Sequence, residues 1–93
     1  MDLLLEVDRE TKHELKTILS QNNIKYIEIF QESITLIDIL EIPLATIKVI
    51  EVIYKWVQKK KMDKPNMVVN IRIEHLILDI KNTDLEHIKK EIK

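Results

Sequence analysis

Hydrophobic residues recur along this chain at two spacings, and the change from one to the other predicts the order of its strands and helices. Leu3, Leu5 and Val7 alternate with their neighbours, which is the spacing of a half-buried β-strand. Asp8 follows as a plausible N-cap, because a short polar side chain can accept hydrogen bonds from the first free N–H groups of a helix. Residues 9–20 then place apolar side chains on one face, so we expect a strand followed by an amphipathic helix.

A second strand is expected directly after this helix. The polar run at residues 21–23 ends the helix, and residues 24–30 are rich in β-branched and aromatic side chains. A strand, a helix and a strand of these lengths predict a parallel pair joined by a right-handed crossover.

Residues 34–61 have an aliphatic helix pattern with one thin polar seam, and Ser33 is a candidate N-cap. Either one helix kinks at Pro43, or a short helix ends near Ile42 and the proline occupies the first turn of the next. Five charged residues within residues 34–57 argue against a transmembrane span. The seam consists of Asp38, Glu41, Ala45, Lys48, Glu51, Lys55 and Gln58.

The last third of the chain has the pattern of a β-hairpin and a short helix. Residues 67–73 and 76–80 each alternate between apolar and polar positions, after a loop at residues 62–66. The turn near Glu74 and His75 lacks the Asn-Gly or Asp-Gly pair that positive φ angles favour, so a longer or irregular connection is expected. A capping box at Thr83-Asp84-Leu85-Glu86 then opens a helix with one apolar face.

These elements predict an α+β fold for a single domain, residues 1–93. The expected order is strand, helix, strand, long helix, strand, strand, helix, with a four-stranded mixed sheet that carries three or four helices in a sandwich. A helix that is apolar around most of its circumference faces more than one neighbour. The long helix is therefore expected to be shared between the core and an interface, while the strand order stays open.

Composition removes several classes of function. The chain has no cysteine, which excludes disulfides and thiolate metal sites and fits a reducing compartment, so the cytoplasm is the expected location. It has no glycine either, and phosphate-cradling loops, dinucleotide fingerprints and nucleophile elbows all need one. A formal net charge of −1 provides no overall field for nucleic acid, and no basic stretch precedes an apolar signal segment.

The candidate reactive residues form no catalytic or metal-binding pattern. Ser20 and Ser33 stand at a helix end and at a predicted cap, and neither has a histidine at a spacing that suggests an activated nucleophile. His13, His75 and His87 are too far apart along the chain to place two ligands on one helix turn. We therefore expect a protein that is not an enzyme and binds no cofactor or metal.

One basic cluster stands beside two aromatic residues, Tyr54 and Trp56. It could form a patch for nucleic acid or lipid headgroups, but lysines are also favoured at a helix C-terminus by the helix dipole. The second interpretation fits the near-neutral chain better, so no nucleic-acid partner is expected. An integral membrane segment is not expected either, because of the charges within residues 34–57. The cluster consists of Lys55, Lys59, Lys60, Lys61 and Lys64.

Four features of the second half occur in a familiar combination. They are an aliphatic helix that ends in residues 52–57 with basic residues after it, strands at residues 67–73 and 76–80, and a closing helix through Leu85 and Ile88. In this combination the chain resembles the effector-associated constant component family of bacterial conflict systems. The resemblance implies a small non-catalytic domain that accompanies caspase-like or trypsin-like proteases as an adaptor.

The leading functional hypothesis is therefore an adaptor or oligomerisation module that binds a protein effector in a bacterial defence system and forms a homo-oligomer. The alternative is an immunity protein or phage-encoded inhibitor that acts by occluding a protein target, and an enzyme ranks last. Tryptophan is enriched among binding anchors. The predicted interface lies on the long helix and consists of Ile50, Ile53, Tyr54, Trp56 and Val57.

Overall fold

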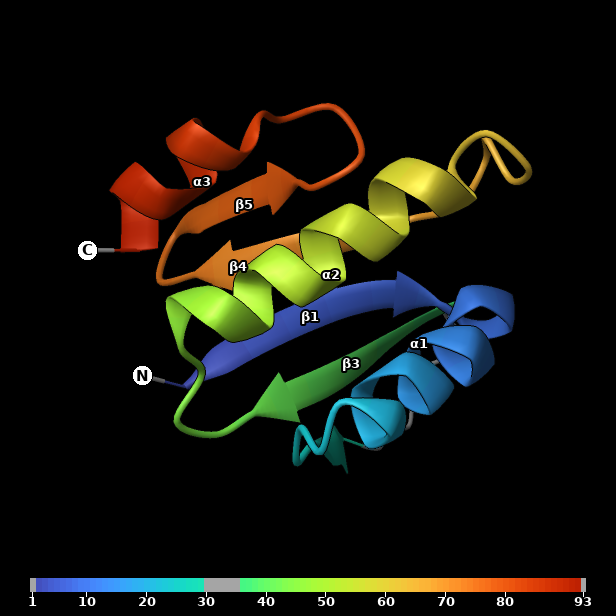
Figure 1. The fold of residues 1–93 in the computed structure, drawn as a ribbon, viewed down its shortest axis with the longest axis horizontal. Helices are drawn as coiled ribbons and strands as arrows, with labels where there is room; N and C mark the ends of the chain where they lie inside the picture. The colour runs from blue at the N-terminus through green and yellow to red at the C-terminus, as the bar shows by residue number, and fades with distance from the viewer. Residues whose placement is uncertain (1, 30–35, 93) are drawn as a thin grey trace.

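A computed structural model describes residues 2–29 and 36–92 of the chain, and in these residues strands and helices form two layers (Figure 1). The elements in chain order are β1 (Leu3–Asp8), α1 (Arg9–Gln21), β2 (Ile27–Ile29), β3 (Ile37–Ile42), α2 (Ile47–Lys60), β4 (Val69–Ile73), β5 (Leu76–Asp79) and α3 (Leu85–Ile92).

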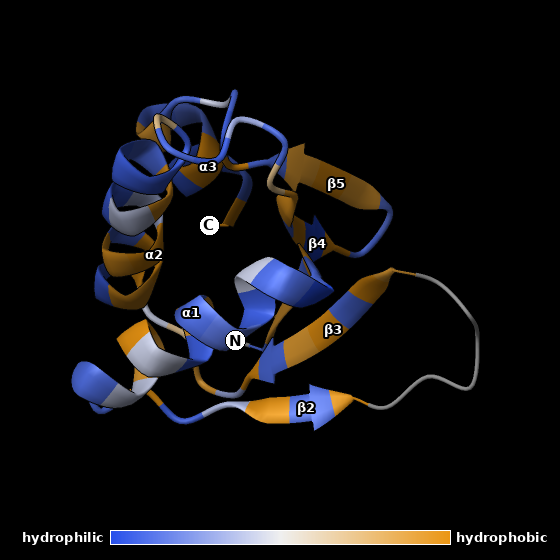
Figure 2. Ribbon diagram, turned by 90° about the vertical axis from the view of Figure 1, so that its right-hand side faces the viewer, coloured by the Kyte–Doolittle hydropathy of each residue, from blue (hydrophilic) through white to orange (hydrophobic). Residues whose placement is uncertain are grey.

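The five described strands form one sheet in the order β2-β3-β1-β4-β5, and every neighbouring pair is antiparallel. All three helices lie on the same side of this sheet (Figure 2). The predicted α+β class is confirmed, whereas the predicted four-stranded mixed sheet is wrong. The predicted parallel pair is also wrong, because β1 pairs with β3 and β4, and β2 pairs only with β3.

The largest error concerns residues 34–61, because residues 37–42 form β3 and the helix begins only at Ile47. Asp38 and Glu41 look like one polar seam in sequence, yet the register of β3 puts them on opposite faces of the sheet. Pro43 follows β3 directly and stands in a turn, so it neither kinks a helix nor opens one. The predicted cap at Ser33 lies outside the described residues.

The ends of α1 follow local rules that the sequence displays. Asp8 is the N-cap as predicted, since its Oδ2 accepts a hydrogen bond from the Thr11 N–H at 3.0 Å. At the other end Asn23 has φ of 57°, and the Ile24 N–H donates to the Leu19 carbonyl at 2.9 Å. This is a Schellman arrangement in which asparagine occupies the position usually taken by glycine.

The β4–β5 hairpin is confirmed, but its turn differs from the expectation. Ile73 pairs directly with Leu76, so the loop has only Glu74 and His75, and Glu74 takes φ of 52° without being glycine. At α3 the predicted capping box is shifted by one residue, because Asp84 is the cap and its Oδ1 accepts from the His87 N–H at 2.9 Å.

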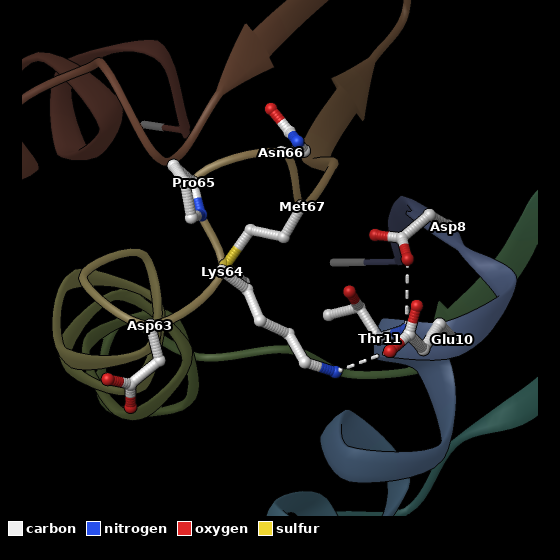
Figure 3. Close-up of a pocket in the computed structure, with 8 residues that line it drawn as sticks. All are labelled: Asp8, Glu10, Thr11, Asp63, Lys64, Pro65, Asn66 and Met67. Carbon is white, nitrogen blue, oxygen red and sulfur yellow. Dashed lines mark hydrogen bonds and ion pairs between the residues drawn. The ribbon is translucent and has the colours of Figure 1, made fainter.

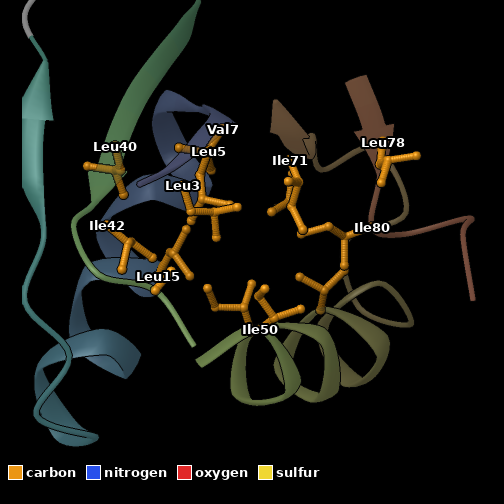
Figure 4. Packing of buried hydrophobic residues seen from close by; sticks show 14 of the residues in the cluster. Leu3, Leu5, Val7, Leu15, Leu40, Ile42, Ile50, Ile71, Leu78 and Ile80 are labelled. Atoms are coloured by element: carbon orange, nitrogen blue, oxygen red, sulfur yellow. The ribbon is translucent and has the colours of Figure 1, made fainter. Parts of the chain in front are cut away.

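The core lies between the sheet and the helices (Figure 4). Alternate residues of β1 point toward the helices and are fully buried. The residues of β3, β4 and β5 that the register places on the same face of the sheet also contribute side chains to this core. The side chains with no more than 1% exposure include Leu3, Leu5, Val7, Leu15, Leu19, Leu40, Ile42, Ile50, Ile53, Val57, Ile71, Ile80 and Ile88.

Leu44 takes φ of 56° although it is not glycine, and its side chain is 80% exposed. The left-handed region costs a residue with a Cβ about 1 to 2 kcal/mol, which glycine avoids at an entropic cost of roughly 0.5 to 1 kcal/mol. We expect Leu44→Gly to raise the free energy of unfolding by about 0.5 kcal/mol in urea titrations. Asn23→Gly is the matched control, and an equal gain there would contradict strain specific to Leu44.

Candidate protein interface

The structure separates the five residues predicted as an interface into two groups. Ile50, Ile53 and Val57 are at most 1% exposed and belong to the core of this chain, so their side chains are not accessible to a partner. Tyr54 and Trp56 are half-buried and pack against the same core. The helix face that the sequence assigns to a partner is thus largely occupied by the sheet.

The basic cluster is partly used within the molecule. Lys60 and Lys64 both reach Glu14 of α1, with Nζ–Oε distances of 2.9 and 3.2 Å, and Lys64 also pairs with Glu10 at 3.1 Å. Hydrogen bonds from the Lys60 and Lys64 side chains lower the pKa of Glu14. These lysines therefore join the C-terminal end of α2 and the following loop to α1, and a phosphate would have to compete with carboxylates already in place.

A cavity of about 270 Å³ lies beside the start of α1 (Figure 3). Asp8 stands at its wall and accepts hydrogen bonds from the Thr11 N–H at 3.0 Å and the Val68 N–H at 2.8 Å. Burial alone would raise the pKa of Asp8, but hydrogen bonds from Thr11 and Val68 together lower it. Since this carboxylate holds two backbone segments together, its role is structural.

The histidines and acids show no metal cage in the part of the chain that the structure describes, where no group of three or more could hold an ion. His87 lies 3.8 Å from Glu91 on the surface of α3, one helical turn away. His13 and His75 are exposed on α1 and in the hairpin turn. The described histidines are thus spread over the molecule.

On the side of the sheet away from the helices, Figure 2 shows no described helix. Antiparallel sheets that face water on one side usually place polar residues there. Here the β2–β3–β1 half carries five apolar side chains next to Glu6 and Glu41, because the register puts residues from these three strands on the same face. We call this set the open-face patch, and it consists of Leu4, Ile27, Ile29, Ile37 and Ile39.

Exposure within the open-face patch increases toward the edge of the sheet. Ile39 at the centre is 9% exposed, Ile29 is 38% exposed and Ile27 is 51% exposed. Large apolar side chains that remain accessible next to each other, with charged residues around them, are typical of interaction surfaces.

The charged residues around the patch are mainly acidic. Of the described strand residues on this face, Arg72 is the one basic side chain, and it lies 4.0 Å from Glu6. Asn70 also approaches Glu6 at 3.5 Å. The face therefore carries an excess of negative charge, while the chain as a whole is almost neutral. The acidic side chains on this face are Glu6, Glu41 and Asp79, because the Asp8 carboxylate at the end of β1 caps α1 instead.

Sequence reasoning missed this surface because it assigned residues 34–42 to a helix. Once Ile37 and Ile39 belong to a strand, their alternation with Asp38 and Leu40 places them beside Ile29 on a face without helices. The signal was present in the β-branched residues of this segment, which favour strands.

Comparison with protein-family models, curated proteins and solved structures gives no match for this chain. Within residues 2–29 and 36–92, none of the helices has the length and apolar character needed to cross a membrane.

Proposed function

We propose that this chain is a non-catalytic protein-binding module and that its partner binds the open-face patch. The observation that carries this proposal is the open-face patch, on a sheet face that no described helix covers, where Ile27 and Ile29 are 51% and 38% exposed. Covering such side chains gains about 25 cal/mol per Å² of apolar surface removed from water. A partner that presents apolar side chains surrounded by basic ones would fit both the patch and its acidic border.

We further propose that the partner is an effector of a bacterial defence system, such as a caspase-like or trypsin-like protease. Support comes from the resemblance of the second half to adaptor domains that accompany such effectors. The helix α2, the hairpin β4–β5 and the helix α3 occupy the segments on which that resemblance rests. In this proposal α2 builds the core, and the sheet provides the contact.

An immunity protein or phage-encoded inhibitor is the second candidate, and the charge of the open face favours it. Three acidic side chains and one arginine among the described strand residues of this face would suit a basic target surface. Complementary charge of this kind accelerates association, and a small domain can then act by occlusion alone. Neutralisation of a toxic neighbouring gene product on co-expression would support this candidate.

The proposal predicts that Ile29→Glu abolishes binding to the effector encoded beside this gene without unfolding the domain. A carboxylate in the centre of an apolar contact would lose its hydration and repel the acidic border, so we expect affinity to fall by at least about a hundredfold. Isothermal titration calorimetry measures the affinity, and circular dichroism checks the fold.

Met62→Glu is the matched control, because Met62 is 79% exposed in the loop after α2 and lies outside the open-face patch. It should leave the affinity within about twofold of the original. Equal losses for Ile29→Glu and Met62→Glu, or full binding by Ile29→Glu, would contradict an interface on the open face.

A further inference from the structure

The strand β5 forms one edge of the sheet, and its outward backbone groups point away from β4. The two-residue turn and the pairs Ile73–Leu76 and Ile71–Leu78 make Leu76 and Leu78 the residues that exchange hydrogen bonds with β4. The backbone groups of Ile77 therefore point outward, as does the N–H of Asp79. Among the described residues, no hydrogen bond to these groups of Ile77 is found.

The sequence of β5 contains neither of the two residue types, lysine and proline, that most often block strand addition at an edge. Edge strands are commonly protected by lysine, proline or a bulge. The sequence of β5 is Leu-Ile-Leu-Asp, and Leu76 and Ile77 are 38% and 53% exposed on its two faces. The opposite edge is different, since β2 has three residues in the described part of the chain and its Glu28 is held by Lys16 of α1.

A cavity of about 320 Å³ lies where this edge meets the end of α3. Figure 1 shows α3 beside β5 at the outer end of the sheet. Ile73 and Leu76 supply apolar walls, while Glu74, His75 and Glu91 bring polar groups. A side chain entering it would meet an apolar wall, the imidazole of His75 and two carboxylates, of which Glu91 also lies 3.8 Å from His87.

We propose that β5 binds an extended peptide segment as an added strand, with a lysine or arginine of that segment in the cavity beside Glu74 and Glu91. The main-chain bonds would form with Ile77 and Asp79, as in other cases of strand addition to an open sheet edge. The long stem of the basic residue lies along Ile73 and Leu76, and its charge faces the two carboxylates. This site uses residues separate from the open-face patch and is independent of the proposed effector.

The test uses two acetylated hexapeptides, one alternating valine with lysine and one alternating valine with glutamate. Binding is followed by hydrogen exchange at the Ile77 amide, with the Leu78 amide as internal reference because it is bonded to β4 with or without peptide. We expect the lysine peptide to slow exchange at Ile77 at least about fivefold and to bind at least about tenfold more tightly than the glutamate peptide.

Ile77→Pro tests the backbone contribution, because proline removes an outward N–H and leaves the bonds to β4 in place. We expect this substitution to lower the affinity for the lysine peptide at least about tenfold. Glu74→Lys should remove most of the preference for the lysine peptide over the glutamate peptide. This variant keeps the test informative if the proline variant fails to fold. Met62→Glu is the control, because Met62 lies outside both proposed sites, and it should bind the peptide like the original protein.

No binding of the lysine peptide at millimolar concentration would overturn the proposal, as would binding without protection of Ile77. Protection of Ile77 that rises with protein concentration in the absence of peptide would also overturn it, because β5 would then pair with a second copy. Loss of effector binding in Ile29→Glu together with normal peptide binding would leave both proposals standing, since each depends on its own residues.

Discussion

We expect Ile53→Ala to lower the free energy of unfolding by about 2 to 5 kcal/mol, the usual range for truncating a buried isoleucine. Ile53 is 1% exposed and lies in the core cluster with Ile50 and Val57, so the substitution leaves a cavity between α2 and the sheet. Urea denaturation followed by circular dichroism measures the change.

Lys55→Ala is the matched control, because Lys55 is exposed on the same helix two residues away. Surface substitutions of this kind usually change stability by less than about 0.5 kcal/mol. If Ile53→Ala were as mild as Lys55→Ala and weakened partner binding instead, α2 would be the interface that its sequence pattern predicts.

The second large effect is expected at Asp8, where Asp8→Ala should cost about 2 to 4 kcal/mol. Its carboxylate caps α1 through the Thr11 N–H and also accepts from the Val68 N–H before β4, which is 60 residues away in the sequence. Alanine removes both acceptors and leaves the Val68 N–H without its partner. Thermal and urea unfolding measure the loss.

Asp84→Ala provides the comparison, because Asp84 caps α3 through a single bond to the His87 N–H and should cost only about 1 kcal/mol. A second comparison is Asp8→Asn. The side-chain oxygen of asparagine can still accept from the Thr11 N–H, but its NH2 group cannot accept from the Val68 N–H. Equal losses at Asp8 and Asp84 would contradict the dual role of Asp8.

The pH dependence at Asp8 has a defined sign. Hydrogen bonds hold the pKa of Asp8 below its ordinary value, so the folded state favours the ionised carboxylate. The contribution of this carboxylate to the free energy of unfolding is complete above the ordinary pKa of about 4. It disappears as the pH falls through the lower pKa that Asp8 has in the folded protein. The difference in stability between the original protein and Asp8→Asn should therefore shrink over that interval.

Local signals in the sequence predicted several elements correctly. The alternation of Leu3, Leu5 and Val7 identifies β1, and Asp8 marks the start of α1, because both features depend on neighbouring residues alone. The hairpin and α3 were found for the same reason.

Other features depend on tertiary context and could not be predicted locally. The strand β3 has apolar residues on both faces, Leu40 toward the helices and Ile39 toward the open side, so strict alternation is lost and a helical period appears. The turn at Glu74 takes a positive φ because the pairing of β4 and β5 outweighs the preference for glycine.

The site was harder to predict than the fold. An apolar helix such as α2 looks the same in sequence whether it faces a core or a partner, since both environments select the same side chains. The open-face patch requires the assignment of β3 and the pairing of β2 with it, because Ile29 and Ile39 become neighbours only in the antiparallel register. That pairing is not encoded by the spacing of either segment.

The most direct test of the proposed open-face interface is a methyl NMR titration of the isoleucine-labelled protein with the product of the neighbouring gene, which the proposal takes as its effector. An interface on the open face predicts large shift changes for Ile27, Ile29 and Ile39, and unchanged signals for Ile50 and Ile53 in the core. Changes concentrated at Ile50 and Ile53, with the open-face isoleucines unaffected, would contradict it and return the interface to α2.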